Sequence, residues 1–108
     1  MEKIQVYAQE LKKLREIFQD VDASQSKLCE GLIEDAAFLK AENYVLKGVL
    51  SQIGMVKIHP NHPEMQKPTE AAKQYLKNLN SYSVVIKTLN GVLNKVAMDD
   101  EDELSDYE

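Results

Sequence analysis

Two histidines, His59 and His62, stand three residues apart in the segment "KIHPNHPEM" and are the only histidines of the chain. On a helix this spacing would place both imidazoles on one face, where they could bind a transition metal. Pro60 and Pro63 exclude such a helix, because proline lacks an amide hydrogen and restricts the residue before it. A catalytic zinc would also need a third protein ligand from elsewhere in the chain. The segment therefore predicts a proline-stiffened bend between two helices, with a small metalloprotein as the weaker alternative.

Cys29 is the only cysteine and the one candidate nucleophile. A single cysteine forms no internal disulfide and no zinc cluster. Cys29 falls beside the apolar stripe of a predicted helix, where a buried, unreactive thiol is expected. The four glycines form no phosphate-binding loop, and no arrangement of serine, histidine and aspartate is evident. We predict a protein that is not an enzyme and that uses no metal, cofactor or small-molecule substrate.

The composition favours a small helical domain that associates with other chains. The chain has 108 residues, 44% of them hydrophobic and none of them tryptophan, so its core must be largely aliphatic. A domain of this size buries a modest core, and partners often complete the burial. The first twenty residues carry eight charges, unlike a secretory signal, and no run of apolar residues is long enough to span a membrane. We expect a cytoplasmic protein with no membrane contact.

The periodicity of apolar residues predicts an all-α fold with three helices, at about residues 2–20, 24–53 and 69–97. The apolar positions of the first helix are Ile4, Tyr7, Leu11, Leu14, Ile17, Phe18 and Val21. Those of the second are Leu28, Leu32, Ile33, Ala36, Leu39, Val45, Leu46, Val49, Leu50 and Ile53. Those of the third are Ala72, Tyr75, Leu76, Leu79, Tyr82, Val85, Ile86, Leu89, Val92, Leu93 and Val96.

Capping residues mark the helix boundaries. After the first helix, Asp22 is placed to act as an N-cap, and Gln25 could reach back to complete a capping box. Gly54 follows the last apolar position of the second helix, where a left-handed C-cap favours glycine. At the start of the third helix, Thr69 could be the N-cap, or Pro68 could stand in the first turn. Residues 54–68, which contain all three prolines, are predicted to be a loop that begins with a briefly extended stretch.

The two long helices have similar lengths and should fold back on each other as an antiparallel hairpin. The first helix then lies across this pair or against a neighbouring subunit. In this interpretation, residues 1–98 form one helical assembly domain. Residues 99–108, "DDEDELSDYE", carry seven of the eighteen acidic residues and are predicted to be a disordered tail when free.

Charge separates the chain into a nearly neutral body and this acidic tail. Residues 1–98 contain thirteen basic and eleven acidic residues. The basic residues that could contact DNA phosphates are Lys12, Lys13, Arg15, Lys57, Lys67, Lys73 and Lys77. A solvated helix face has the same pattern, so the alternative is that these residues bind nothing. A ring of subunits would repeat a weak patch many times.

The acidic tail also has two interpretations. It could raise solubility alone, or it could dock on a basic surface through acidic side chains and apolar anchors. The candidate partner-binding residues are Asp99, Asp100, Glu101, Asp102, Glu103, Leu104, Asp106 and Tyr107. The apolar residues among the acids favour docking, either on a partner or on the protein's own lysines.

Four segments of the chain carry a resemblance. They are "LCEGLIEDAAFLKAENYVL", "SQIGMVKIHP", "YLKNLNSYSVVIKTLNGVL" and the terminal "DDEDELSDYE". Together they resemble the small terminase subunits of tailed bacteriophages, in particular the P-twenty-seven-like type of phages of low-GC Gram-positive bacteria. The likeness covers roughly residues 10–108. The residues that match the helix-packing pattern are Leu32, Ala36, Ala37, Phe38 and Tyr82.

This resemblance implies an all-helical protein that assembles into rings, binds double-stranded viral DNA at the packaging start, and recruits or regulates a large subunit. That large subunit holds the ATPase and the nuclease, so the small subunit itself is not catalytic. The implied place of action is the host cell cytoplasm during phage assembly. The chain lacks the "LGLTP" plus arginine pattern of many relatives, and it has no recognisable helix-turn-helix. The rival interpretation is a phage or bacterial regulator that acts through its acidic tail without binding DNA.

Overall fold

The computed structural model describes the backbone of residues 1–106 and the side chains of residues 1–94. Its elements in chain order are α1 (Lys3–Ile17), α2 (Ala23–Ile53), β1 (Val56–His59), β2 (His62–Pro68) and α3 (Glu70–Asp106). The Cα trace measures 73 × 29 × 17 Å, so the molecule is long and thin. None of the helices in the described part of the chain is both long and apolar enough to cross a membrane.

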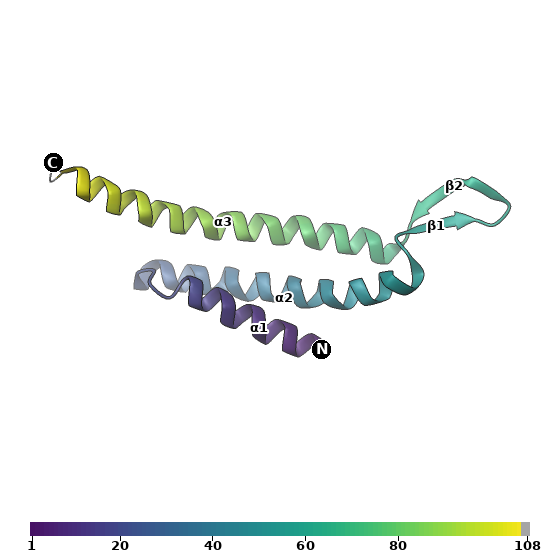
Figure 1. Cartoon of the computed structure of the whole chain (residues 1–108), viewed down its shortest axis with the longest axis horizontal. Helices are drawn as coiled ribbons and strands as arrows, with labels where there is room; N and C mark the ends of the chain where they lie inside the picture. Colours follow the sequence, from purple (N-terminus) through teal and green to yellow (C-terminus); the bar gives the residue numbers. More distant parts are fainter. Residues whose placement is uncertain (107–108) are drawn as a thin grey trace.

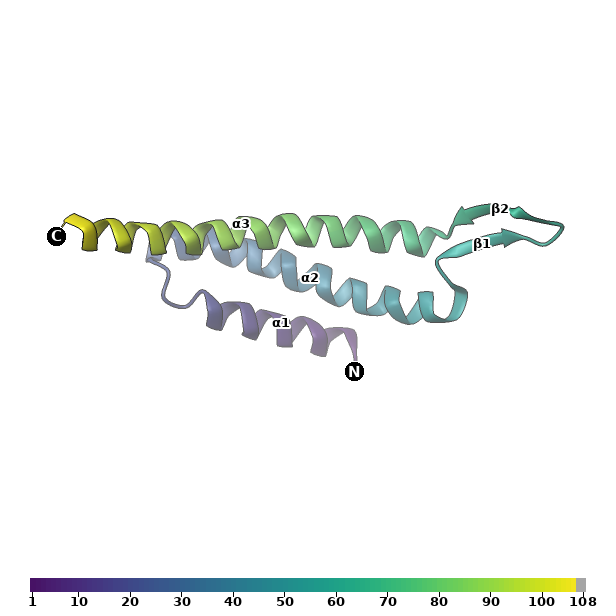
Figure 2. The ribbon, with the colours of Figure 1, turned by 45° about the horizontal axis from the view of Figure 1, so that its top comes forward.

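α2 is the central helix of the fold. It packs on both α1 and α3, and it runs in the opposite direction to α3 beside it (Figure 1). Ion pairs join Lys3 to Glu42 and Arg15 to Glu30, which shows that α1 also runs antiparallel to α2. Turned by 45°, the structure shows α1 and α3 on either side of α2 (Figure 2). The two strands project from the end of the helical body that lies away from the chain's C-terminus.

The prediction of three helices is confirmed, but the prediction of a loop at residues 54–68 is wrong in part. β1 and β2 form an antiparallel β-hairpin in which Val56 pairs with Pro68 and Ile58 with Gln66. The prolines exclude helix as expected, yet their fixed φ is compatible with extended backbone at the free edges of a two-stranded sheet. The mostly helical fold therefore includes a short sheet.

At the boundary between α1 and α2, only one of the two hydrogen bonds of the predicted capping box forms. The Asp22 carboxylate accepts a hydrogen bond from the Gln25 amide at 2.9 Å and one from the Ser24 hydroxyl at 2.8 Å. These bonds lower the pKa of Asp22, the bond from Gln25 having the largest effect. The reciprocal bond, from the Asp22 amide to Gln25 Oε1, is absent, since Gln25 Oε1 has no partner among the described residues. Asp22 is thus the N-cap, without the full capping box.

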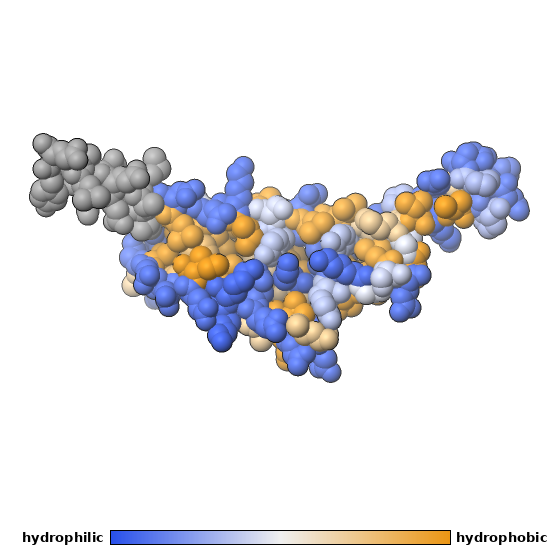
Figure 3. All heavy atoms as spheres, viewed as in Figure 1, coloured by the Kyte–Doolittle hydropathy of each residue, from blue (hydrophilic) through white to orange (hydrophobic). Residues whose placement is uncertain are grey.

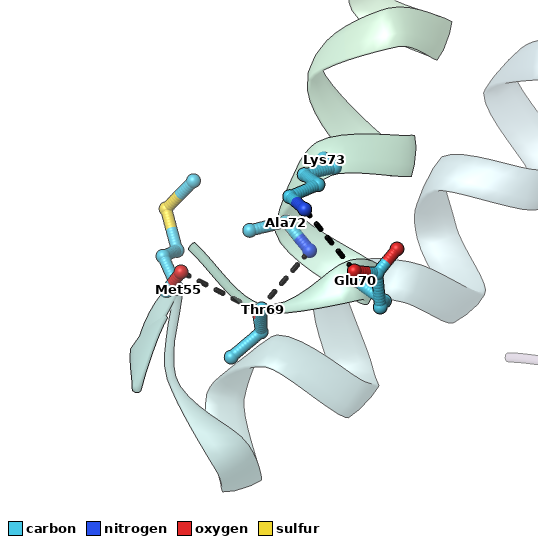
Figure 4. A network of polar contacts seen from close by, with 5 residues as sticks. All are labelled: Met55, Thr69, Glu70, Ala72 and Lys73. Atoms are coloured by element: carbon cyan, nitrogen blue, oxygen red, sulfur yellow. Dashed lines mark hydrogen bonds and ion pairs between the residues drawn. The ribbon is translucent and has the colours of Figure 1, made fainter. Parts of the chain in front are cut away.

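Gly54 and Thr69 close the base of the β-hairpin. Gly54 has a φ of +80°, as its C-cap position requires, and its amide donates to the Leu50 carbonyl at 2.8 Å. The Thr69 hydroxyl donates to the Gly54 carbonyl at 3.1 Å and accepts from the Ala72 amide at 3.2 Å. The Thr69 amide also donates to the Met55 carbonyl at 2.9 Å (Figure 4). Thr69 therefore caps α3, as predicted, and also ties α3 to the end of α2.

The core lies in the half of the molecule where all three helices meet. Its buried residues are Leu14, Phe18, Cys29, Ile33, Ala36 and Leu89. Cys29 is 1% exposed, and burial raises the pKa of its thiol, so the predicted buried cysteine is confirmed. Burial of such side chains contributes about 1.5–3 kcal/mol for each large aliphatic residue.

A polar link joins α1 to α3 beside this core. The buried face of α1 is formed by Val6, Glu10 and Leu14, of which only Leu14 belongs to the apolar stripe predicted from the sequence. The Tyr82 hydroxyl donates to Glu10 Oε1 at 2.8 Å, and Lys13 Nζ lies 3.4 Å from Glu10 Oε2. Glu10 is only 6% exposed, so its polar atoms need these two partners in place of water.

Several residues predicted to be core are instead on the surface. Ile4 is 72% exposed, Ile17 50% and Leu28 67%. Lys3, the first residue of α1, pairs with Glu42, so the last turns of α2 extend beyond α1. Figure 3 shows hydrophobic residues exposed along the helical body and at the base of the β-hairpin. Each helix therefore has more apolar surface than the other helices of the same chain can cover.

α3 extends further than the sequence indicated. The helix was expected to end near residue 97, and its helical backbone continues to Asp106. The side chains of residues 95–108, and all of residues 107 and 108, lie outside the described residues. The predicted disorder of the acidic segment 99–108 falls in this region and stays a prediction.

The polar link predicts the effect of removing one hydroxyl. Tyr82→Phe leaves the buried Glu10 carboxylate without its donor and should lower the free energy of unfolding by about 1–3 kcal/mol, measured by urea denaturation. Tyr44→Phe is the matched control, because Tyr44 is 40% exposed and makes no hydrogen bond in the described structure. Equal stability losses in the two variants would contradict the role of the link.

The raised pKa of Tyr82 predicts that the protein loses stability at alkaline pH. Burial, and then Glu10, raise the pKa of Tyr82 to about 12 from an ordinary value of 10.0. The unfolded chain releases the tyrosine proton first as the pH rises, so this contribution is complete below pH 10 and is lost between about pH 10 and 12. Unfolding of the wild type and Tyr82→Phe at a series of alkaline pH values should show a smaller loss in the variant.

Candidate nucleic-acid interface

The β-hairpin brings together two lysines that are ten residues apart in the sequence. Lys57 on β1 is directly opposite Lys67 on β2 in the antiparallel register. Every residue of both strands is exposed, and the strands project away from the helices (Figure 1). A two-stranded ribbon has dimensions that the major groove of B-form DNA admits. The hairpin therefore presents a compact, accessible pair of positive charges.

The histidines flank the turn at the tip of this β-hairpin. Their ring centroids are 5.1 Å apart with an interplanar angle of 49°. The Asn61 amide donates to His59 Nδ1 at 3.1 Å, and His62 Nδ1 lies 3.3 Å from Glu64 Oε1. Among the described residues, no group of three or more potential ligands is placed to hold a metal ion. The pair is thus part of the turn, where Pro60 and Asn61 reverse the chain.

A hollow of about 520 Å³ runs along the β-hairpin and is bordered by both lysines. Its lining residues are Lys57, Ile58, His59, Pro60, Glu64, Met65, Gln66 and Lys67. Glu64 is the only carboxylate in this lining, and it lies beside His62. Neither lysine has a carboxylate partner within 4.0 Å in the described structure, so both ammonium groups are available to an anion.

Two further candidate lysines lie on α3 just past the β-hairpin. Lys73 Nζ is 3.1 Å from Glu70 Oε1, so a carboxylate already offsets its charge (Figure 4). Lys77 is exposed one turn further along the helix and has no ion pair in the described structure. The predicted cluster of four lysines is reduced to the hairpin pair, with Lys77 beyond it.

The candidates on α1 form a separate and largely neutralised set. Arg15 is paired with Glu30, and the hydrogen bond to that carboxylate is the main cause of its raised pKa. Lys13 is paired with Glu10. Of these three α1 candidates, Lys12 alone has no such partner in the described part of the chain, and it is exposed. These residues therefore contribute to intramolecular packing more than to a free basic patch.

A second basic position, which was not predicted from the sequence, lies at the junction of the three helices. A cavity of about 100 Å³ is lined by Val6, Lys40, Asn43, Tyr44, Lys47, Leu79 and Tyr82. Lys40 Nζ lies 5.7 Å from the centroid of the Tyr82 ring. Asn43 is buried, and its Oδ1 has no partner among the described residues. The seven-residue spacing of Lys40 and Lys47 was the available signal for this shared position.

Other expectations have mixed outcomes. Ala36 and Ala37 are fully buried and Leu32 and Tyr82 are half-buried, in agreement with the packing that the resemblance implied. Phe38 is 54% exposed, so it lies outside the core of the single chain, and the packing role that the resemblance implies for it stays a prediction. The candidate tail residues, from Asp99 to Tyr107, lie where side chains are outside the described structure.

Comparison of this chain with protein-family models, curated proteins and solved structures finds no match. Function must therefore be inferred from the residues and their geometry. The arrangement with the clearest chemical meaning is the exposed lysine pair on the β-hairpin, because two adjacent positive charges suit a polyanion.

The hairpin lysines predict a salt-dependent affinity for DNA. Lys57→Gln combined with Lys67→Gln should weaken binding to double-stranded DNA and reduce the slope of log affinity against log salt by about 2 for each bound chain. Fluorescence anisotropy at several salt concentrations measures both quantities. Lys27→Gln combined with Lys87→Gln is the matched control, with the same change in net charge at exposed helical positions. An equal loss in the control would mean that only net charge matters.

Proposed function

We propose that this protein is a non-catalytic, self-assembling adaptor of phage DNA packaging, of the small terminase type. The observation that carries the proposal is the projecting β-hairpin with Lys57 opposite Lys67. Two phosphate contacts per chain are too few for tight binding, but a ring of subunits multiplies them. The resemblance of the helical segments and of the acidic terminus to small terminase subunits supports the same function.

Self-assembly is supported by the shape of the chain and by its apolar surface. A stable domain is usually built from at least two packed layers, whereas this chain is only 17 Å thick along its shortest axis. Large hydrophobic residues are exposed on α1, α2, the β-hairpin and α3. In the proposed assembly the antiparallel pair of α2 and α3 forms the body of each subunit, and neighbouring subunits cover part of this surface.

The proposed role of the acidic segment is to recruit the large subunit. Its seven carboxylates suit a basic surface on that partner, and Leu104 and Tyr107 supply apolar anchors. ATP hydrolysis and DNA cleavage then belong to the large subunit. The adaptor would act in the host cytoplasm, where phage heads are filled.

A second candidate is a regulator that binds a protein through its acidic segment and does not bind DNA. The observation that favours it is that Lys13, Arg15 and Lys73, three of the seven candidate bases, are already paired with carboxylates. The remaining positive charge of one subunit is therefore small. This candidate differs from the first in its expected mass and in its affinity for DNA.

The native mass separates the two candidates. Light scattering behind a sizing column at moderate salt should give a discrete assembly of several subunits. A monomer across the accessible concentration range would contradict the packaging adaptor and favour the regulator.

Removal of residues 99–108 tests the acidic segment. A chain that ends at Met98 should keep its helical circular dichroism and its native mass, and should lose binding to the large subunit in a pull-down assay. Retained binding would contradict the recruiting role. If the segment instead covers the chain's own lysines, the truncated chain will bind DNA more tightly than the full chain.

A further inference from the structure

A small cavity lies where α1, α2 and α3 meet, and we name it the Asn43 cavity. Its volume is about 100 Å³, which is more than one water molecule needs. All three helices contribute to it, with α1 and α3 on either side of α2 (Figure 2). Its lining residues are Val6, Lys40, Asn43, Tyr44, Lys47, Leu79 and Tyr82, and none of them is a carboxylate. The Asn43 cavity is therefore a recess with basic and polar walls.

Asn43 brings a buried amide group without a partner to this cavity. The residue is 5% exposed, and its Oδ1 has no hydrogen-bond partner among the described residues. Because Oδ1 is fully buried, the end of the amide that can reach the cavity is its NH₂ group, which is a donor. A buried amide oxygen without a hydrogen bond destabilises a fold. A ligand explains an amide at this position better than the stability of the isolated chain does.

Two lysines on either side of Asn43 add positive charge to the same wall. Lys40 precedes Asn43 by three residues and Lys47 follows it by four, so the three residues share one face of α2. Neither lysine forms an ion pair with a carboxylate of the described residues, and both are exposed. Lys40 Nζ lies 5.7 Å from the centroid of the Tyr82 ring, which also lines the cavity. Two ammonium groups and one amide donor thus border one recess.

The carboxylate of Glu10 is close to this recess, but its charge is already offset. Glu10 Oε1 accepts a hydrogen bond from the Tyr82 hydroxyl at 2.8 Å, and Lys13 Nζ lies 3.4 Å from Glu10 Oε2. Glu10 is not one of the lining residues. The Asn43 cavity therefore keeps the positive charge of Lys40 and Lys47.

This set of donors suits a phosphate group with two negative charges. Lysine is a common phosphate ligand, and an amide NH₂ can donate to a further oxygen. A phosphate monoester carries about 1.5 to 2 negative charges at pH 7 and three strong acceptor oxygens. A carboxylate has one charge and two oxygens, so it would satisfy fewer of these donors. A small recess also admits a free ion or a terminal phosphate more readily than a phosphodiester whose chain continues on both sides.

We propose that the Asn43 cavity binds a dianionic phosphate group, held by the ammonium groups of Lys40 and Lys47 and by the NH₂ group of Asn43. A free phosphate ion and the terminal phosphate of a DNA strand present the same chemistry, and the experiments separate these two sources. The site goes beyond the proposed function, because it requires neither a ring of subunits nor the lysines of the β-hairpin.

Calorimetric titration of the full chain with inorganic phosphate, at constant ionic strength, tests the site. Lys40→Gln combined with Lys47→Gln should weaken phosphate binding about tenfold or more, because two charge-assisted hydrogen bonds are lost. Lys27→Gln combined with Lys87→Gln is the matched control, with the same change in net charge at exposed positions outside the cavity lining. It should bind phosphate as the wild type does. No phosphate binding by the wild type, or an equal loss in the two double variants, would overturn the proposal.

Asn43→Leu separates binding from folding. Leucine is close to asparagine in size and removes the unpartnered oxygen, so the urea midpoint of unfolding should stay the same or rise. The affinity for phosphate should nevertheless fall severalfold, because the amide donor is lost. Circular dichroism reports whether the variant is folded, and the lysine variants decide the question if it is not. Unchanged phosphate affinity in the folded variant would overturn the proposal.

Two DNA duplexes that differ only in a 5′-terminal phosphate identify the source of the ligand. If DNA supplies it, the phosphorylated duplex will bind more tightly than the 5′-hydroxyl duplex, and Lys40→Gln combined with Lys47→Gln will abolish the difference. Equal affinities of the two duplexes assign the cavity to the free ion. Phosphate binding without any DNA binding would contradict the packaging function and support this site, whereas DNA binding without phosphate binding would do the reverse.

Discussion

The structure depends on the packing of α2 against both α1 and α3. α1 and α3 both bury their apolar faces against it, and the buried side chains gather where the three helices overlap. Because α1 is about half as long as α2, it covers only part of the central helix. Several apolar side chains of α2 therefore stay in contact with water. The limited core and the exposed apolar surface are therefore two results of the same mismatch in length.

The β-hairpin and the helical body are suited to different ligands. The body offers apolar surface with scattered, mostly paired charges, which favours protein contacts. The hairpin offers unpaired positive charge on a narrow ribbon, which favours a polyanion. Assembly through the body would set the spacing of the hairpins, so weak contacts at each tip could act together on one DNA molecule. In this way, packing between subunits and contact with DNA become parts of one mechanism.

Features that depend on a few neighbouring residues were predictable from the sequence. Asp22, Gly54 and Thr69 mark boundaries because caps require particular side chains or backbone angles at fixed positions. The pairing of Lys57 with Lys67 was not predictable, because it depends on the register of two strands. The prolines of this segment had indicated a loop, so these strands were not predicted. The inward position of Glu10 was also missed, since its burial requires Tyr82, seventy-two residues away. Periodicity identified which α2 residues are apolar, but only the reach of α1 determines which of them are covered.

The hydrogen bonds at Thr69 have a mechanical consequence. Through its hydroxyl and its amide, this residue holds the carbonyls of Gly54 and Met55 while it also caps the first turn of α3. The base of the ribbon is thus fastened to both long helices at a single residue. A sideways force on the hairpin tip would produce a torque about the base of the hairpin at Thr69, and this torque would act on α3. Tension on a polymer bound at the tip would then change the angle between α2 and α3, far from the point of contact.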